Sequence, residues 1–185
     1  SSSYGNYDFC HIQYFMTYVL GYRSESGKKA QLGTACHKVM ECLASCQKEL
    51  QDNPEEKSLT ITDDAIGEVE FTPKKLNTKK FVAGLLTRSY DYYGSRDSHK
   101  YYPADFKFCE KQIETAISFN DGQFDPRKRI IVDTEPTFDI PIEEDWAKYK
   151  YEMPDGTVVE GNLAIKGTID LVTKIDDNII EVVDW

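Results

Sequence analysis

The sequence predicts an α/β domain in which helices come first and a β-rich half follows. Apolar residues recur at helical spacing in several stretches between residues 7 and 117. After the turn signal NDGQFDPRKR at 120–129, the pattern changes to runs of β-formers. A chain of 185 residues is long enough for one hydrophobic core. We therefore predict a single domain over residues 1–185, with a mixed central sheet formed by the C-terminal strands and flanked by helices.

Two helices are predicted in the first 50 residues. The stretch YDFCHIQYFMTYVLGY at 7–22 carries apolar residues at helical spacing, with Gly21 as its C-cap. RSESGKK at 23–29 is predicted to be a polar loop. A long helix follows over about 32–50, and DNPEEK ends it because the residue before a proline disfavours helical geometry.

The middle of the chain, about residues 50–130, is predicted to be a helical basic insert that caps the sheet. Residues 58–72 are ambiguous, because SLTIT suits a short strand while TDDAIGEVEF could begin with a helix cap. Helices are predicted over 79–93 and 106–117, separated by the tyrosine-rich YYGSRDSHKYYPAD.

The C-terminal third is predicted to form strands and hairpins. IIVDTEPTFDIPI is a strand interrupted by prolines, and YKYEMPDGTVVEG is a hairpin around Pro154–Gly156. LAIKGTIDLVTKI and NIIEVV are two further strands joined across Asp176–Asn178. Asp170 and Asp184 are equidistant from this last turn, so an antiparallel hairpin places them side by side.

Adjacent carboxylates at Asp170 and Asp184 would repel each other unless a divalent cation or a shared proton lies between them. Oxygen ligands suit Mg²⁺ or Mn²⁺ rather than Zn²⁺. The alternative is that one of the two is merely solvent-exposed. Spacing alone favours that alternative, because 32 of the 185 residues are acidic.

The stretch GTACHKVME at 33–41 holds a second group of polar residues. His37 and Glu41 are four residues apart and share a helix face. Gly33 allows another backbone to approach closely. Taken alone, a histidine near a helix start is more often a structural hydrogen-bonding group than a ligand.

Charge is distributed unevenly along the chain. The net charge is −10, which argues against unselective binding to polyanions. Residues 74–129 nevertheless carry 12 Lys and Arg against 7 Asp and Glu. Basic residues there, with Tyr92 and Tyr93, suit a surface for single-stranded nucleic acid, and Lys79, Lys80 and Arg88 are the candidate phosphate contacts. Equally, the tyrosines could fill the small core of a helical cap.

Five cysteines are an odd number for a disulfide framework, which predicts a reducing, intracellular and cytoplasmic location. Cys36, Cys42 and Cys46 do not share one helix face, so we expect buried thiols rather than a metal site. No stretch suits a membrane span, and the polar start SSSYGNYDF does not suit a signal peptide.

Three stretches in order resemble the RecB-like branch of the PD-(D/E)XK nuclease superfamily. The Ser-rich start leads to a helix that contains Cys10 and ends in Leu-Gly; GTACHKVME is similar to the family's Gly-x-x-x-His-x-x-x-Glu helix. GTIDLV and IIEVVDW are similar to its Gly-x-x-Asp strand and its Asp-x-Lys strand. The middle, about 50–130, matches no part of the family that we can place.

The resemblance implies a restriction-endonuclease-like fold and a metal-dependent DNA nuclease, an exonuclease on single-stranded or end-bearing DNA. It also implies that His37, Asp170 and Asp184 bind Mg²⁺ or Mn²⁺, together with the main-chain carbonyl of Trp185. Glu135 resembles an acidic residue that some members place beside the metal. Two alternatives stay open: a non-catalytic nuclease-like domain that binds DNA or a protein partner, and a structural core that binds no nucleic acid.

Two further expectations concern residues beyond these 185. The family's lysine would fall one position after Trp185, so we expect the natural protein to continue there. The chain as given should then bind metal but cleave poorly. Cys10 is similar to the N-terminal cysteine of iron–sulfur members, whose other three cysteines follow the Asp-x-Lys strand, so no cluster is expected in this chain.

Overall fold

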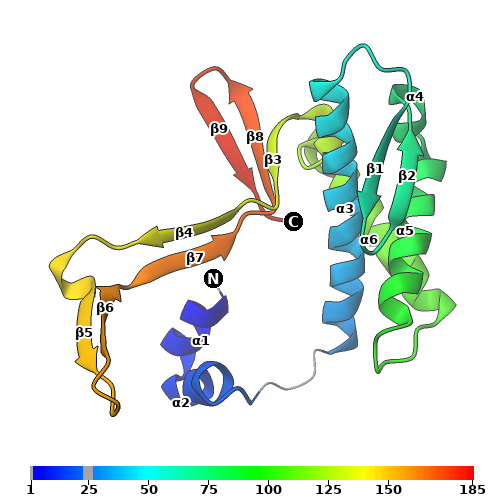
Figure 1. Cartoon of the computed structure of the whole chain (residues 1–185). Helices are drawn as coiled ribbons and strands as arrows, with labels where there is room; N and C mark the ends of the chain where they lie inside the picture. The colour runs from blue at the N-terminus through cyan, green and yellow to red at the C-terminus, as the bar shows by residue number, and fades with distance from the viewer. Residues whose placement is uncertain (1, 23–26) are drawn as a thin grey trace.

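The computed structural model describes residues 2–22 and 27–185 (Figure 1). The helices are α1 Ser2–Phe9, α2 His11–Tyr14, α3 Lys28–Asp52, α4 Pro73–Leu76, α5 Lys79–Gly94 and α6 Pro103–Ser118. The strands are β1 Leu59–Asp63, β2 Gly67–Phe71, β3 Ile130–Thr134, β4 Thr137–Pro141, β5 Lys148–Glu152, β6 Val158–Asn162, β7 Ala164–Thr168, β8 Leu171–Asp176 and β9 Ile179–Val183. Short 3₁₀ segments cover Phe119–Gly122, Pro126–Lys128 and Asp145–Ala147. The fold is α/β, as the sequence predicts.

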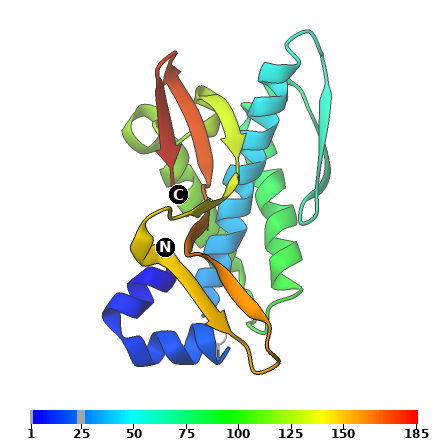
Figure 2. The same ribbon diagram turned by 60° about the vertical axis from the view of Figure 1, so that its left-hand side comes forward.

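Helix α3 lies at the centre of the molecule, between the sheet of β3, β8 and β9 and the helices α5 and α6 (Figures 1 and 2). Its 25 residues include the predicted helix 32–50, and it ends at Asp52, before Pro54. It begins at Lys28, inside the predicted polar loop, of which residues 23–26 lie outside the described part of the chain. The side chains that α3 buries are mainly apolar: Leu32, Ala35, Val39, Met40, Cys42, Leu43, Ala44 and Cys46.

The ambiguous stretch 58–72 forms an antiparallel hairpin, β1–β2, so the strand alternative is correct. The Asp63 carboxylate accepts hydrogen bonds from the Ala65 and Ile66 amides, and Gly67 takes a positive φ of 77° in the turn. Lys38 on α3 lies 3.2 Å from Asp63 and also pairs with Glu41. Glu41 therefore holds the Lys38 ammonium group in place, and Lys38 connects this hairpin to α3 through its ion pair with Asp63.

The main core is shared by α3, the β1–β2 hairpin, α4, α5 and α6. Its largest fully buried side chains include Phe71, Leu43, Leu76, Leu86 and Val39. The predicted insert therefore does not stand apart from the N-terminal helix, because both contribute to one apolar cluster. All five cysteines are free thiols. Cys42 and Cys46 are buried in this core as predicted, whereas Cys36 is only partly buried.

A three-stranded sheet in the order β3-β8-β9 covers another side of α3. Its inward side chains, Ile131, Leu171 and Val183, pack against Ala44 of α3. Leu171 pairs with Val183, which is the register that sets Asp170 beside Asp184. The sequence predicts a mixed sheet, whereas every strand pair in the described part of the chain is antiparallel.

Beyond this sheet, β4 and β7 continue β3 and β8 as a two-stranded ribbon that leads away from α3 to the β5–β6 hairpin (Figure 1). The predicted strands 130–142 and 163–175 are thus each divided in two. The division falls at Glu135–Pro136 on one side and Ile169–Asp170 on the other. The hairpin turns at Gly156, which has a positive φ of 85°.

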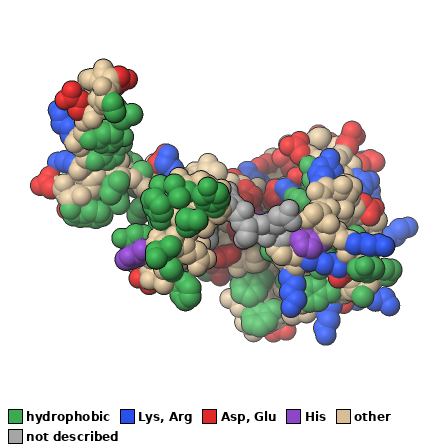
Figure 3. All heavy atoms as spheres, turned by 90° about the horizontal axis from the view of Figure 1, so that it is seen from below, with side chains coloured by type: hydrophobic (Ala, Val, Ile, Leu, Met, Phe, Trp, Pro, Cys, Tyr) green, Lys and Arg blue, Asp and Glu red, His purple; other side chains and the backbone are tan. Residues whose placement is uncertain are grey.

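The predicted single helix over 7–22 is wrong. Helix α1 ends at Phe9, Cys10 is extended with a φ of −159°, and α2 then leads into a π-helical turn over Phe15–Val19. Gly21 has a positive φ of 75°, as its predicted capping position requires. Apolar side chains here remain exposed, Phe9 at 84% and Ile12 at 75%, and hydrophobic groups cover this region in Figure 3.

Of the helices that the structure describes, none combines the length and the apolar composition that a bilayer span requires.

Candidate metal centre

Three side chains from distant parts of the sequence converge beside α3. They are His37 from α3, Glu135 from the junction of β3 and β4, and Asp170 from the junction of β7 and β8. One nitrogen or oxygen atom of each lies within 4.8 Å of the others. The His37 Nε2 atom is 2.8 Å from Glu135 Oε1, and His37 Nδ1 is 3.6 Å from Asp170 Oδ2. Because these ligand atoms lie so close together, a single ion could contact all three side chains, which are partly buried.

The break in the ribbon explains how the two acidic residues reach the same point. The Glu135 amide donates to the Asp170 carbonyl over 3.2 Å, and the Ile169 amide donates to the Pro136 carbonyl over 3.0 Å. Glu135 takes a φ of 51°, which is uncommon for a residue with a side chain. This conformation bends the strand and leaves the Glu135 carboxylate hydrogen-bonded to the imidazole of His37.

The electrostatics around Asp170 favour a cation. Burial raises the pKa of Asp170 above its ordinary value, and the neighbouring Asp184 carboxylate raises the pKa further. The Trp185 amide, which donates to Asp170 Oδ2 over 3.1 Å, and the His37 ring oppose this change. Burial and a second carboxylate thus disfavour the anionic form of Asp170, whereas a bound divalent cation would favour it.

The structure places Asp184 and Trp185 beside this cluster. Asp184 is exposed at the end of β9 and interacts with Asp170, although it is not one of the three clustered ligand groups. The Trp185 ring lies 6.2 Å from the His37 ring, between centroids. The chain end, marked in Figure 1, lies beside the break in the ribbon. Coordination by Asp184 and by the Trp185 carbonyl stays a prediction.

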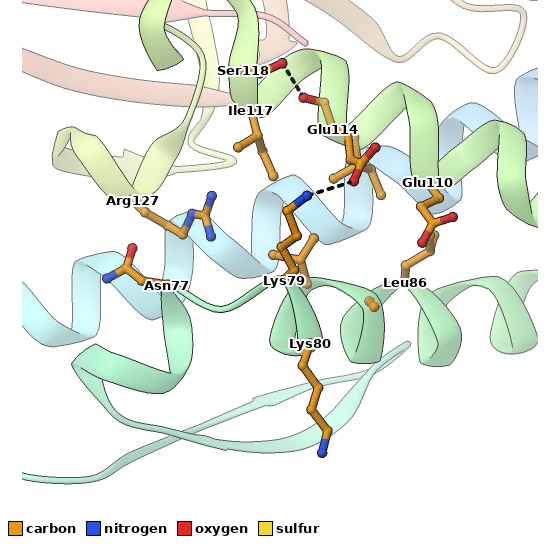
Figure 4. A pocket seen from close by; sticks show the side chains of 12 residues that line it. Asn77, Lys79, Lys80, Leu86, Glu110, Glu114, Ile117, Ser118 and Arg127 are labelled. Carbon is orange, nitrogen blue, oxygen red and sulfur yellow. Dashed lines mark hydrogen bonds and ion pairs between the residues drawn. The ribbon is translucent and has the colours of Figure 1, made fainter.

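The basic residues predicted to contact phosphates lie outside the three-residue cluster. Lys79 and Lys80 are exposed in the first turn of α5 and line a cavity of about 580 Å³ between α5 and α6 (Figure 4). Lys79 Nζ is 3.6 Å from a Glu114 carboxylate oxygen, an ion pair drawn in Figure 4. Arg88 instead donates to the carbonyls of Ile66 and Glu68, and so binds α5 to the β1–β2 hairpin.

The tyrosines of the insert take part in packing. Tyr92 and Tyr93 meet edge to face with ring centroids 5.1 Å apart, and the Arg96 guanidinium lies 3.6 Å over the Tyr92 ring. Burial raises the pKa of Tyr93. Both side chains remain partly exposed, so stacking on bases stays a prediction for this pair.

The donor set suits a divalent cation. An imidazole nitrogen and two carboxylate oxygens are ligands that Mn²⁺ and related ions accept, and His37, Glu135 and Asp170 present one such group each within a short range. Fold and site together define the class: an α/β domain with a candidate site for a divalent metal ion at a break in an antiparallel ribbon.

The family follows from comparison with known proteins. The model of the PD-(D/E)XK nuclease superfamily matches residues 1–185, so the chain belongs to this superfamily. Membership indicates nuclease activity, a nucleic-acid substrate and use of divalent metal ions, which nucleases of this superfamily generally require. Comparisons with curated proteins and with solved structures gave no significant match.

The conformation of Glu135 leads to a paired prediction. Glu135→Ala and Glu135→Gly both remove the carboxylate, but only alanine keeps a side chain at the positive φ of 51°. We expect the glycine variant to be more stable than the alanine variant by about 1 kcal/mol, because left-handed backbone costs about that much for residues with a Cβ. Urea unfolding of the two variants measures the difference, and an alanine variant of equal or greater stability would contradict the backbone geometry.

Proposed function

We propose that the chain is a nuclease domain of the RecB-like branch that hydrolyses phosphodiester bonds in DNA with Mg²⁺ or Mn²⁺. His37, Glu135 and Asp170 would hold the ion, joined by Asp184 and the Trp185 carbonyl. The observation that carries this proposal is the convergence of His37, Glu135 and Asp170, whose ligand atoms lie within 4.8 Å although the residues are far apart in sequence. Exposed acidic groups are common without a bound ion, so an isolated carboxylate would not support a metal site.

The residues of the site have separable tasks in this proposal. His37 supplies a nitrogen ligand from a rigid helix, and the carboxylates of Glu135 and Asp170 supply negative charge from the two strands of the ribbon. The Trp185 amide fixes the orientation of Asp170 by hydrogen bonding to Oδ2. A divalent cation held there would polarise the phosphoryl oxygens and make hydroxide available near neutral pH.

An exonuclease acts only at strand ends, which gives the proposal a direct test. End-labelled linear single-stranded DNA and a circular single strand of similar length are each incubated with the 185-residue chain. We expect slow degradation of the linear strand with Mg²⁺ or Mn²⁺, none with EDTA, and an intact circle. Cleavage that persists in EDTA would contradict the metal mechanism, and cleavage of the circle would show an endonuclease.

The basic insert is proposed to bind single-stranded DNA through phosphate contacts. Lys79 and Lys80 are the informative residues, since Lys79 is 96% exposed while Arg88 supports the hairpin through two carbonyls. Lys79→Glu with Lys80→Glu should weaken binding to single-stranded DNA and reduce the slope of log K against log salt by about 1.4, that is about 0.7 per lost contact.

A matched control is Lys148→Glu with Lys150→Glu on β5, which reverses two exposed lysines at the far end of the ribbon. Fluorescence anisotropy of a labelled oligonucleotide across a salt series measures both double variants. An unchanged salt slope for Lys79→Glu with Lys80→Glu would show that the insert is a structural cap.

A further inference from the structure

A small cavity adjoins the candidate metal centre. It has a volume of about 290 Å³ and lies between α3 and α6, with Trp185 on its third side. His37 and Trp185 line this cavity and also belong to the metal centre or contact its ligands. The two sites are therefore continuous. A volume near the lower end of the usual range for ligand pockets suits a single small group.

The walls of the cavity carry an aromatic ring, an amide and an ammonium group. Phe108 on α6 lines it with a ring that is 45% exposed, and Gln112 lies one turn further along the same helix. Lys29, in the first turn of α3, contributes a cation. An exposed aromatic ring offers a stacking surface for any base, an amide offers both a donor and an acceptor, and an ammonium suits phosphate.

Trp185 adds an unsatisfied polar group at this place. Its indole Nε1 atom is buried and finds no hydrogen-bond acceptor among the residues that the structure describes. Buried donors are normally paired, so an orphaned one indicates an acceptor supplied from outside the chain or by ordered water.

Gly33 leaves open space beside this cavity. It lies inside α3, is exposed, and lines the cavity, and a Cβ built on it would meet no atom within 4 Å. A glycine inside a helix is destabilising relative to alanine, and the fold gives no steric reason to keep one at this position. A larger side chain at residue 33 would project beside this cavity. His37, one helical turn later, lines the same cavity.

We propose that this cavity binds the base and sugar of one unpaired nucleotide whose phosphate lies at the metal centre. The inference rests on the proposed function and extends it to the form of the substrate. A base that enters this small cavity to stack on Phe108 leaves its duplex partner, so the site takes single strands or frayed ends and excludes a closed duplex.

The test uses Trp185 as a reporter. The chain has two tryptophans, and Trp146→Phe leaves Trp185 as the only tryptophan, whose emission can be excited selectively over that of the tyrosines. In this background, thymidine 5′-monophosphate is titrated in the presence of Mg²⁺. Gly33→Leu, which fills the space beside the cavity, and Phe108→Ala, which removes the stacking ring, should each weaken binding at least about fivefold.

The matched control is Gly84→Leu on α5, an exposed helical glycine that also has no atom within 4 Å of a built Cβ and does not line this cavity. It should bind the nucleotide like the parent. Equal binding by the parent, Gly33→Leu and Phe108→Ala would overturn the proposed pocket.

Two further arms separate this inference from the proposed function. Mg²⁺ binding, measured by calorimetry without nucleotide, should be unchanged in Gly33→Leu and Phe108→Ala, because neither residue offers a metal ligand. A parent chain that binds the nucleotide but no Mg²⁺ would contradict the proposed nuclease function and would still support the nucleotide pocket. An unlabelled ten-nucleotide single strand should displace the mononucleotide, whereas a blunt duplex of the same sequence should not. Equal displacement by both would overturn the requirement for an unpaired nucleotide.

Discussion

Asp170→Asn is expected to lower the affinity for Mn²⁺ by at least about 100-fold and to abolish metal-dependent cleavage. The substitution removes one negative charge from the cluster, in which Asp170 Oδ2 lies 3.6 Å from His37 Nδ1. Loss of groups that only support metal ligands already costs about 10- to 100-fold, so loss of a ligand should cost no less. The amide oxygen can still accept the Trp185 amide, so the fold without metal should persist.

Thermal melting measures the effect directly. A ligand that binds only the folded state raises the melting temperature, so Mn²⁺ should stabilise the parent and not Asp170→Asn. The matched control is Asp139→Asn on β4, whose carboxylate pairs with Lys166 on the exposed ribbon. That variant should keep the full shift. Equal Mn²⁺ affinity for the parent and Asp170→Asn, measured by calorimetry, would remove Asp170 from the site.

Phe71→Ala is expected to lower the free energy of unfolding by about 3–5 kcal/mol, the usual cost of deleting a buried aromatic side chain. Phe71 on β2 is fully buried and lies 6.5 Å from the Phe81 ring, between centroids. Its cluster includes side chains of α3, α5 and α6. The substitution should therefore destabilise the whole domain, including α3, the helix that carries His37.

Urea unfolding followed by both circular dichroism and tryptophan fluorescence checks this prediction. Phe119→Ala is the control, because that ring is 53% exposed and its removal should cost less than about 1 kcal/mol. Coincident transitions for Phe71→Ala would support one cooperative unit. Two separated transitions, with fluorescence lagging behind, would show that the segment 50–130 unfolds independently of the metal centre.

Features that depend on local chemistry could be predicted from the sequence. The turn between β8 and β9 predicts that Asp170 and Asp184 lie close together. The pair next to the turn is Asp176 with Ile179, and an irregularity between Lys174 and Asp176 shifts the pairing by one residue to the register that sets Asp170 beside Asp184. The predicted helix 79–93 matches α5, because Thr78 caps its N-terminus and the apolar residues keep a regular spacing. The position of His37 on a long helix could likewise be predicted from the regular spacing of apolar residues.

Features that depend on tertiary contacts could not be predicted in this way. Glutamate is not a residue that signals left-handed backbone, so the sequence does not show the bend at Glu135. Only the family resemblance indicates its role. From the sequence, Arg88 is simply one more basic residue of the insert. In the structure its guanidinium donates hydrogen bonds to the carbonyls of Ile66 and Glu68. Helical spacing over 7–22 likewise reveals neither the break at Cys10 nor a packing partner.

The most direct test of the metal centre is a crystal structure with Mn²⁺, in which anomalous scattering locates the ion. We expect one peak within coordination distance of His37, Glu135 and Asp170, about 2.0–2.3 Å from each ligand atom. The same peak should be absent from crystals of Asp170→Asn. A peak at another place, or none in crystals of the parent at saturating Mn²⁺, would contradict the metal centre on which the proposed nuclease activity depends.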